Sequence, residues 1–127
     1  MAKLLVAGGL YEKDETGPLR RRFAEALGRQ TILRGHTLLG GCRTQLDLVV
    51  AQAASAAAQS RKLDPNKMIH SWVTRSTTPI HKFGEITRSQ LGDWSEVPRG
   101  FAFPEPVREC DAMIIIGGWD GTQHAAS

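Results

Sequence analysis

Glycine pairs are the first residues of this chain whose type and position suggest chemistry. Gly8-Gly9, Gly40-Gly41 and Gly117-Gly118 each follow a short apolar run. Because glycine has no Cβ, the backbone at such a pair can approach an anion closely. The amides that open a following helix point toward that anion with the positive end of the helix dipole. Three pairs in equivalent positions favour a phosphate or ribose site over three unrelated tight turns.

Several polar and aromatic residues stand beside these pairs. Arg43 begins a predicted helix and could contact an anion or remain solvated, and Arg75 ends a predicted strand at the same edge. Thr122 could donate its hydroxyl to a phosphate, cap its helix, or do both. Trp119 could stack on a base or pack within the fold. The predicted ligand-binding set is Gly8, Gly9, Gly41, Arg43, Arg75, Gly117, Gly118, Trp119, Asp120, Gly121 and Thr122.

The elements that must position this set alternate between strands and helices. Apolar runs predict strands at Lys3–Gly8, His36–Leu39, Lys67–Arg75 and Ala112–Ile116. The alternation predicts an α/β fold, a Rossmann-like three-layer sandwich whose parallel strands have the order 3-2-1-4. Since the carboxyl ends of parallel strands meet at one edge, the glycine pairs would meet there too.

Two amphipathic helices are expected between the first three strands. The first follows Thr16 and stops at Gly35, and its large apolar residues fall near one face: Leu19, Phe23, Ala26, Leu27 and Leu33. The second follows a capping box made by Thr44 and Asp47. Its apolar residues recur at helical spacing: Leu46, Val49, Val50, Ala53, Ala54 and Ala57.

Residues 76–107 show no sustained periodicity and contain four prolines. Segments of this length without structure are uncommon in compact domains, so a lid over the ligand and an assembly surface are equally favoured. A helix should begin after Gly121-Thr122. We therefore expect residues 1–127 to form the leading part of a longer domain, with the sheet continuing beyond residue 127.

Composition limits the classes of function. The 127 residues suit one domain, and 16 basic against 13 acidic side chains give a charge of +3 that lies in the first half. This surplus suits a small anionic ligand better than nucleic acid. Two cysteines indicate neither a disulfide scaffold nor a metal site, and no cofactor is expected. A cytoplasmic location is predicted because no membrane span and no signal peptide are evident in this segment.

Two familiar nucleotide-binding motifs are missing. No G-x-G-x-x-G follows the first strand and no G-K-[ST] occurs anywhere, which argues against a dinucleotide-dependent dehydrogenase and a P-loop enzyme.

The glycine-bearing segments nevertheless resemble the SLOG superfamily. The resemblance rests on Gly8-Gly9, Phe23–Gly28, Leu38–Arg43 and Ile114–Thr122. That superfamily groups LOG-type cytokinin-activating phosphoribohydrolases, Smf/DprA proteins, and sensor domains of antiviral effectors such as Thoeris-type systems. The resemblance implies a Rossmann-like sheet that binds a nucleotide or nucleotide-derived ligand.

The catalytic motif of the LOG enzymes, P-G-G-x-G-T-x-x-E, is only partly matched. Ile116 stands in place of the proline, one extra residue separates Gly118 from Gly121, and residues 123–126 include no carboxylate. The sequence therefore predicts no catalytic residue. Together with this departure, the resemblance implies a sensor that binds an ADP-ribose-like or cyclic nucleotide signal and regulates an attached or associated effector in antiviral defence. A homo-oligomer is expected.

The alternative is a LOG-like N-glycosidase, a phosphoribohydrolase acting on nucleoside monophosphates. In that case Glu85 or a partner chain would have to supply the missing carboxylate, or His124 would have to transfer the proton.

Overall fold

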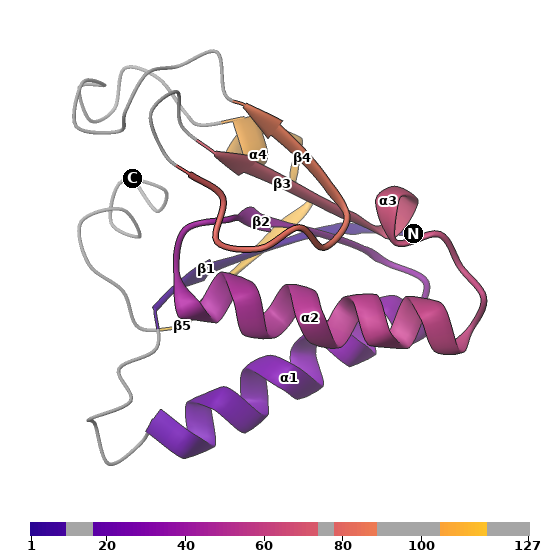
Figure 1. Cartoon of the computed structure of the whole chain (residues 1–127), viewed down its shortest axis with the longest axis horizontal. Helices are drawn as coiled ribbons and strands as arrows, with labels where there is room; N and C mark the ends of the chain where they lie inside the picture. Colours follow the sequence, from indigo (N-terminus) through magenta and orange to yellow (C-terminus); the bar gives the residue numbers. More distant parts are fainter. Residues whose placement is uncertain (10–16, 74–77, 89–104, 117–127) are drawn as a thin grey trace.

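The computed structural model describes residues 1–9, 17–73, 78–88 and 105–116 (Figure 1). Its elements in chain order are β1 (Lys3–Gly8), α1 (Gly17–Leu33), β2 (Thr37–Gly41), α2 (Gln45–Ser60), α3 (Pro65–Met68), β3 (Ile69–Val73), β4 (Glu85–Arg88), α4 (Glu105–Glu109) and β5 (Ala112–Ile116).

The five strands form one parallel sheet in the order β4-β3-β2-β1-β5. This confirms the α/β class and the order of the four expected strands. The prediction missed the fifth strand, β4, which lies within residues 76–107 and pairs with β3 from His70↔Glu85 to Val73↔Arg88. Its four residues begin and end with exposed charged side chains, so no apolar run marked it.

The sheet is covered differently on its two faces. Val6, Leu38 and Ile69 belong to the core cluster that α2 completes, and α1 and α2 lie on this side (Figure 1). Because side chains alternate along a strand, Lys3 points to the opposite face. There its Nζ lies 3.7 Å from the carboxylate of Glu109, at the end of α4. Helices therefore flank the sheet on both sides, and the expected three layers are present.

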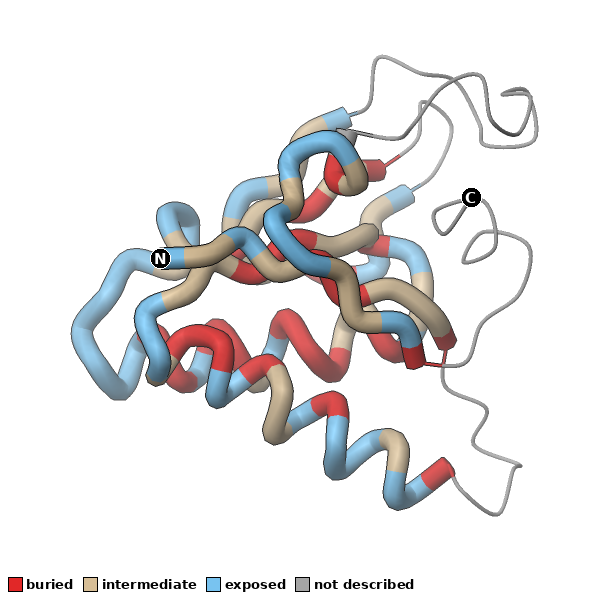
Figure 2. The backbone as a smooth tube through the Cα atoms, turned by 180° about the vertical axis from the view of Figure 1, so that it is seen from behind, coloured by how far each residue is buried: buried red, intermediate tan, exposed pale blue. Residues whose placement is uncertain are grey.

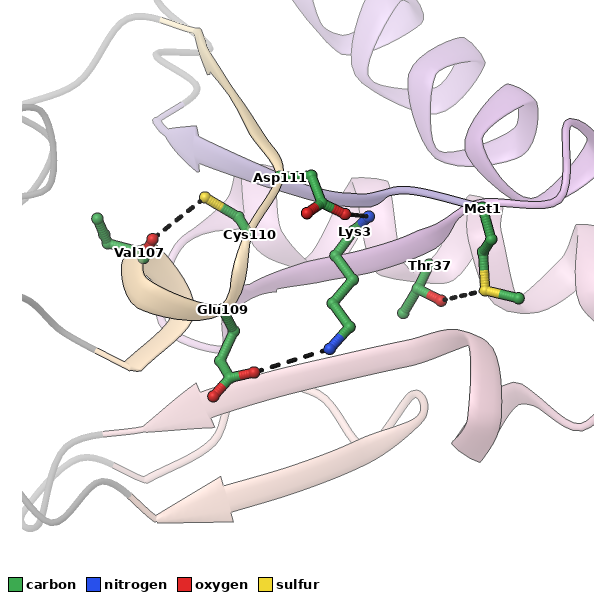
Figure 3. Close-up of polar contacts among 7 residues, drawn as sticks. All are labelled: Met1, Lys3, Thr37, Val107, Glu109, Cys110 and Asp111. Atoms are coloured by element: carbon green, nitrogen blue, oxygen red, sulfur yellow. Dashed lines mark hydrogen bonds and ion pairs between the residues drawn. The ribbon is translucent and has the colours of Figure 1, made fainter.

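The junction of α4 and β5 is fastened to the start of β1 (Figure 3). The backbone N of Lys3 donates to Oδ2 of Asp111, and the backbone N of Asp111 donates to the carbonyl of Lys3, both at 2.8 Å. Cys110 Sγ donates to the carbonyl of Val107 at 3.3 Å within the same turn. These contacts set the position at which β5 enters the sheet beside β1.

Helix α1 packs through a face that differs in part from the predicted one, since Leu27 and Leu33 pack against the core but Leu19 and Phe23 do not. Its buried residues are Gly17, Ala24, Gly28, Thr31 and Ile32. A Cβ on Gly28 would overlap the carbonyl oxygen of Val50 in α2, so the two helices touch at backbone distance. Leu19 and Phe23 are 64% and 52% exposed. The expectation that these two residues belong to the packed side of an amphipathic helix is wrong, because a close helix crossing requires small residues.

Helix α2 follows the predicted pattern closely. Leu46, Val49, Val50, Ala54 and Ala57 are buried, and only Ala53 of the predicted set is merely half-buried. Gly35 has φ +80° just beyond the end of α1, as expected of a stop residue.

Two strand boundaries differ from prediction. In β2 the pair Gly40-Gly41 lies inside the strand, opposite Ser71 and Trp72, instead of following it. In β3 the strand begins only at Ile69, because the four-residue helix α3 precedes it. Among the described residues no helix has the length and apolar character needed to cross a membrane.

Candidate functional site

The order of the strands defines where a ligand would bind. From the central strand β1 the chain moves to β2 on one side, and later to β5 on the other. Sheets of this kind bind ligands outside the carboxyl ends of the strands, at the point where the order reverses. Here that point lies between the ends of β1 and β5, at Gly8 and Ile116.

The first glycine pair holds these two strand ends together. Gly8 has φ +135°, and a Cβ there would overlap the carbonyl oxygen of Ile116. The backbone N of Gly9 donates to that same oxygen at 3.0 Å. Gly8 is therefore required for the close approach of β1 and β5, whether or not a ligand binds nearby.

The second glycine pair and the start of α2 adjoin the first. Thr44 Oγ1 donates to the carbonyl of Gly8 at 3.3 Å, which ties the amino end of α2 to the end of β1. At Gly41 a Cβ would lie 3.1 Å from Oδ2 of Asp47. The structure thus brings together Gly8, Gly9, Gly41 and Arg43 of the predicted set.

The predicted capping box is confirmed, and it changes what α2 can offer an anion. Oδ2 of Asp47 accepts hydrogen bonds from the backbone N of Arg43 and of Thr44, each at 3.0 Å. In return the backbone N of Asp47 donates to Thr44 Oγ1 at 3.2 Å. The side chains of Thr44 and Asp47 therefore already satisfy three backbone amides that a phosphate could have used. Asp47 occupies the place of an external anion.

Burial and the neighbouring polar groups have opposite effects on the pKa of Asp47. Burial raises the pKa of Asp47, while hydrogen bonds from Thr44 and Arg43 and the nearby Arg43 guanidinium lower it in part. The Arg43 side chain is exposed and lies at the carboxyl edge of the sheet. It can pair with a ligand phosphate, whereas the carboxylate beside it suits hydroxyl groups better than phosphate oxygens.

A second group at this edge carried no clear signal in the sequence. Cys42 and His81 are both buried, at 0% and 5% exposed. Cys42 Sγ donates to the carbonyl of His81 at 3.2 Å, and the backbone N of Ile80 donates to the carbonyl of Cys42 at 3.0 Å. Residues 78–84 are thereby fastened over the end of β2.

The His81 ring is only half satisfied. Nδ1 accepts from the backbone N of Phe83 at 3.1 Å, while Nε2 is buried and has no partner among the described residues. Burial lowers the pKa of His81 and raises that of the Cys42 thiol. Both groups are therefore neutral near pH 7, and Cys42 is not a thiolate nucleophile.

The remaining predicted ligand-binding residues lie outside the described residues. They are Arg75, Gly117, Gly118, Trp119, Asp120, Gly121 and Thr122, and His124 lies outside as well. Within the described ranges no group of three or more His, Cys, Asp or Glu side chains could hold a metal ion.

Comparison with known proteins identifies the fold class. No family model matches the chain, and no curated protein does. The X-ray structure of TM1055, a Northeast Structural Genomics Consortium target, is similar with a TM-score of 0.74 at 18% identity. The similarity covers 99% of this chain and 66% of that one.

A second solved structure is a molybdenum cofactor carrier protein from Chlamydomonas reinhardtii. It has a TM-score of 0.66 at 16% identity, over 98% of this chain and 68% of that one. This chain therefore spans about two thirds of the length of both proteins. At these identities the likeness shows a shared Rossmann-like α/β fold.

Proposed function

We propose that the chain binds a nucleotide-derived small molecule at the carboxyl edge of its sheet, without turning it over. The observation that carries this proposal is the switch point between β1 and β5, where Gly8-Gly9 and the start of α2 converge. Folds of this class use that crevice for ligands. In the sequence, the third glycine pair, Gly117-Gly118, follows Ile116 directly.

The backbone amides that are already hydrogen-bonded suggest which part of the site would bind the phosphate of a ligand and which part would bind its ribose. Asp47 takes the amides of Arg43 and Thr44, so we assign phosphate to the Arg43 guanidinium and to the glycines after β5. We assign the ribose hydroxyls to the Asp47 carboxylate, because a hydroxyl group can donate a hydrogen bond to it and an ionised phosphate oxygen cannot. A ligand carrying both groups, such as an ADP-ribose-like or cyclic nucleotide signal, fits this division.

The finer function follows from the SLOG resemblance. On this proposal the chain is a SLOG-like sensor that regulates an attached or associated effector in antiviral defence and works as a homo-oligomer. The C. reinhardtii neighbour is named as a carrier, and a carrier also binds without turnover.

The position of Glu85 argues against the hydrolase alternative in which this residue supplies the missing carboxylate. Glu85 is the first residue of β4, so it lies at the amino end of a strand, away from the carboxyl edge. Two strands, β3 and β2, separate β4 from β1, which at about 4.8 Å per strand places Glu85 roughly 14 Å to the side. Glu85 is therefore too far away to supply the missing carboxylate within one chain.

The proposal is tested by titrating the protein with nucleoside monophosphates, ADP-ribose and cyclic ADP-ribose isomers while following heat and released base. We expect saturable binding with intact ligand recovered. Base release that disappears in Asp120→Ala or His124→Ala would replace the sensor with a hydrolase.

Arg43→Ala should weaken binding by about 1.5–3 kcal/mol, because a charge-assisted hydrogen bond to phosphate is lost. Arg61→Ala is the matched control, since Arg61 is also exposed but caps the opposite end of α2. Equal affinities for both variants would remove Arg43 from the site.

A further inference from the structure

We propose that the outer face of α1 docks an acidic amphipathic helix of a partner protein. This outer face is defined by Leu19 and Phe23 together with the flanking Arg22 and Arg29. The proposal does not rest on the nucleotide site, because none of these four residues belongs to the predicted ligand-binding set. Helix α1 lies beside α2 on the helical side of the sheet (Figure 1).

The first observation is that α1 has two packing faces, of which the fold uses one. Ala24 and Gly28 form the face pressed against α2, and they are small because the two backbones nearly touch. Leu19 precedes Gly28 by nine residues, about two and a half turns, so the two residues lie on opposite sides of the helix. Leu19 and Phe23 therefore face away from the core, whereas Ile32, Leu27 and Leu33 pack in or against it. Helix α1 lies at the outside of the molecule in both views (Figures 1 and 2).

The exposed residues have the spacing of a helix-docking surface. Leu19 and Phe23 are one turn apart and 64% and 52% exposed. Residues at i and i+4 form one continuous patch on a helix. A second helix that lies along this patch would place its own apolar residues at i, i+3, i+4 and i+7, as amphipathic helices do in other docking sites.

Charge identifies the kind of partner. Helix α1 carries four arginines and one glutamate, and Glu25 already lies 3.6 Å from Arg21. Arg22 and Arg29 are exposed and seven residues apart, so both border the same side of the apolar patch. A second copy of this chain docked on this face would bring arginines against arginines, which disfavours self-association through the outer face of α1. A partner helix with glutamates beside its apolar stripe has the complementary charge.

A membrane surface fits less well than a helix. Interfacial helices bury a broad apolar face, and they combine it with basic residues on the polar side. Here the side of α1 opposite the patch is fixed against α2, and the patch presents two large apolar side chains. This area suits a single helix.

The experiment uses the complete chain and a fluorescent synthetic peptide of about 18 residues, with leucines at helical spacing flanked by glutamates. A matched peptide carries glutamine in place of each glutamate. We expect saturable binding of the acidic peptide, weakened about tenfold or more by the glutamine replacements and by added salt. No saturable binding, or equal binding of both peptides, would overturn the proposal.

Variants locate the binding on α1. The double variant Leu19→Glu with Phe23→Glu should bind the acidic peptide about tenfold or more weakly, because both apolar contacts are lost and like charges are added. Leu63→Glu is the control, since Leu63 is 41% exposed but lies outside α1. Both variants should keep the wild-type circular dichroism and unfolding midpoint. A large loss of stability in the double variant would show that the two residues belong to the core, which would contradict the proposal.

Two further measurements separate the other occupants. Sedimentation of the chain alone reports self-association, and flotation with vesicles containing about 30 mol% phosphatidylserine reports membrane binding. We expect neither to change in the double variant. Dimerisation or vesicle binding that the double variant abolishes would assign the face to a second copy or to a membrane instead.

Discussion

Asp47 shows how a single side chain limits the chemistry of this site. Its carboxylate bonds two backbone amides at the start of α2, and the fold keeps it there although burial disfavours its charge. A helix amino end attracts anions because its first amides lack partners. Here the chain supplies its own anion, so an external phosphate would have to displace Asp47 or bind elsewhere.

The pKa of Asp47 leads to a prediction about stability and pH. Burial raises this pKa in the folded state, so the folded chain holds the proton more tightly than the unfolded chain does. The free energy of unfolding should therefore fall, relative to Asp47→Asn, as pH rises from about 3.9 through the raised value. Urea unfolding of both proteins between pH 3.5 and 7, on the order of eight points, measures the difference. A difference that grows with pH would contradict the assignment.

Gly8 has a structural role that can be separated from any role in binding. Its φ of +135° and the overlap of a Cβ with the Ile116 carbonyl should make Gly8→Ala costly even without ligand. Gly35→Ala is the matched control, because Gly35 also has a positive φ of +80° but a Cβ there would meet nothing within 4 Å. We expect Gly8→Ala to lower the free energy of unfolding by about 1–2 kcal/mol more than Gly35→Ala does. Equal losses in urea unfolding would mean that β1 and β5 can separate cheaply.

At the scale of elements, the contact between α1 and α2 determines which side of α1 remains exposed. Ala24 and Gly28 let the backbones meet, and the larger Leu19 and Phe23 are left outside. Hydrophobic periodicity locates apolar faces but does not say which face meets the core. In α1 the small residues Ala24 and Gly28 mark the packed face, because they let the two helices approach closely and make many van der Waals contacts.

Residues 78–84 behave as one element fastened over the end of β2. Ile80 and Cys42 share a backbone hydrogen bond, Cys42 Sγ reaches the carbonyl of His81, and Phe83 donates to the His81 ring. The ring must be neutral at Nδ1 to accept that bond. Protonation of His81 would therefore break a contact inside this segment.

Acidification should loosen this segment. Burial lowers the pKa of His81, so the stability that its neutral form provides is complete above the unfolded value of about 6.5 and is lost as pH falls through the lower folded value. The free energy of unfolding of wild type should thus decrease relative to His81→Gln between pH 7.5 and about 5. Hydrogen exchange at Ile80 and Phe83 should speed up over the same range in wild type only. Unchanged exchange would show that the ring does not control the segment.

At the scale of the whole molecule, the parts of the fold that were predictable from sequence are those with regular patterns. The apolar runs of β1 and β5 and the periodic face of α2 are each specified by burial against the rest of the fold. The edge strand β4 was not predicted, because its first and last residues are the exposed Glu85 and Arg88 and its two middle residues are only half-buried. β4 forms because it pairs with β3 in the folded chain, and the local spacing of apolar residues does not predict this pairing.

The parts of the candidate site that could be predicted are those formed by residues close together in the sequence. The capping box of Thr44 and Asp47 follows from residue types at a fixed spacing, and it formed as expected. The hydrogen bond from Thr44 to Gly8 joins residues 36 positions apart, so no local sequence pattern predicts it. The burial of His81 depends likewise on where residues 78–84 cross the end of β2.

The sheet order predicts how protection against hydrogen exchange is distributed. β1 and β2 have a strand on both sides and lie over the helical core, whereas among the described residues β4 pairs with β3 alone. Besides the ladder, a hydrogen bond between His70 Nε2 and Thr87 Oγ1 at 2.7 Å joins β4 to β3. Strands with few buried contacts open locally at a lower free energy than the core. Native-state exchange should therefore show the amides of β4 exchanging through local opening and those of β1 and β2 through global unfolding.

Removing the side-chain bond provides the matched comparison for this prediction. Thr87→Val keeps the shape of the residue but loses the hydroxyl, so it should speed exchange in β4 by up to about tenfold, the equivalent of roughly 1 kcal/mol, and leave β1 unchanged. Equal protection of β4 and β2 in wild type would contradict the prediction, because it would show that the edge strand unfolds only together with the whole sheet. In that case residues 78–88 would be as much a part of the cooperative core as the strands that carry the glycine pairs.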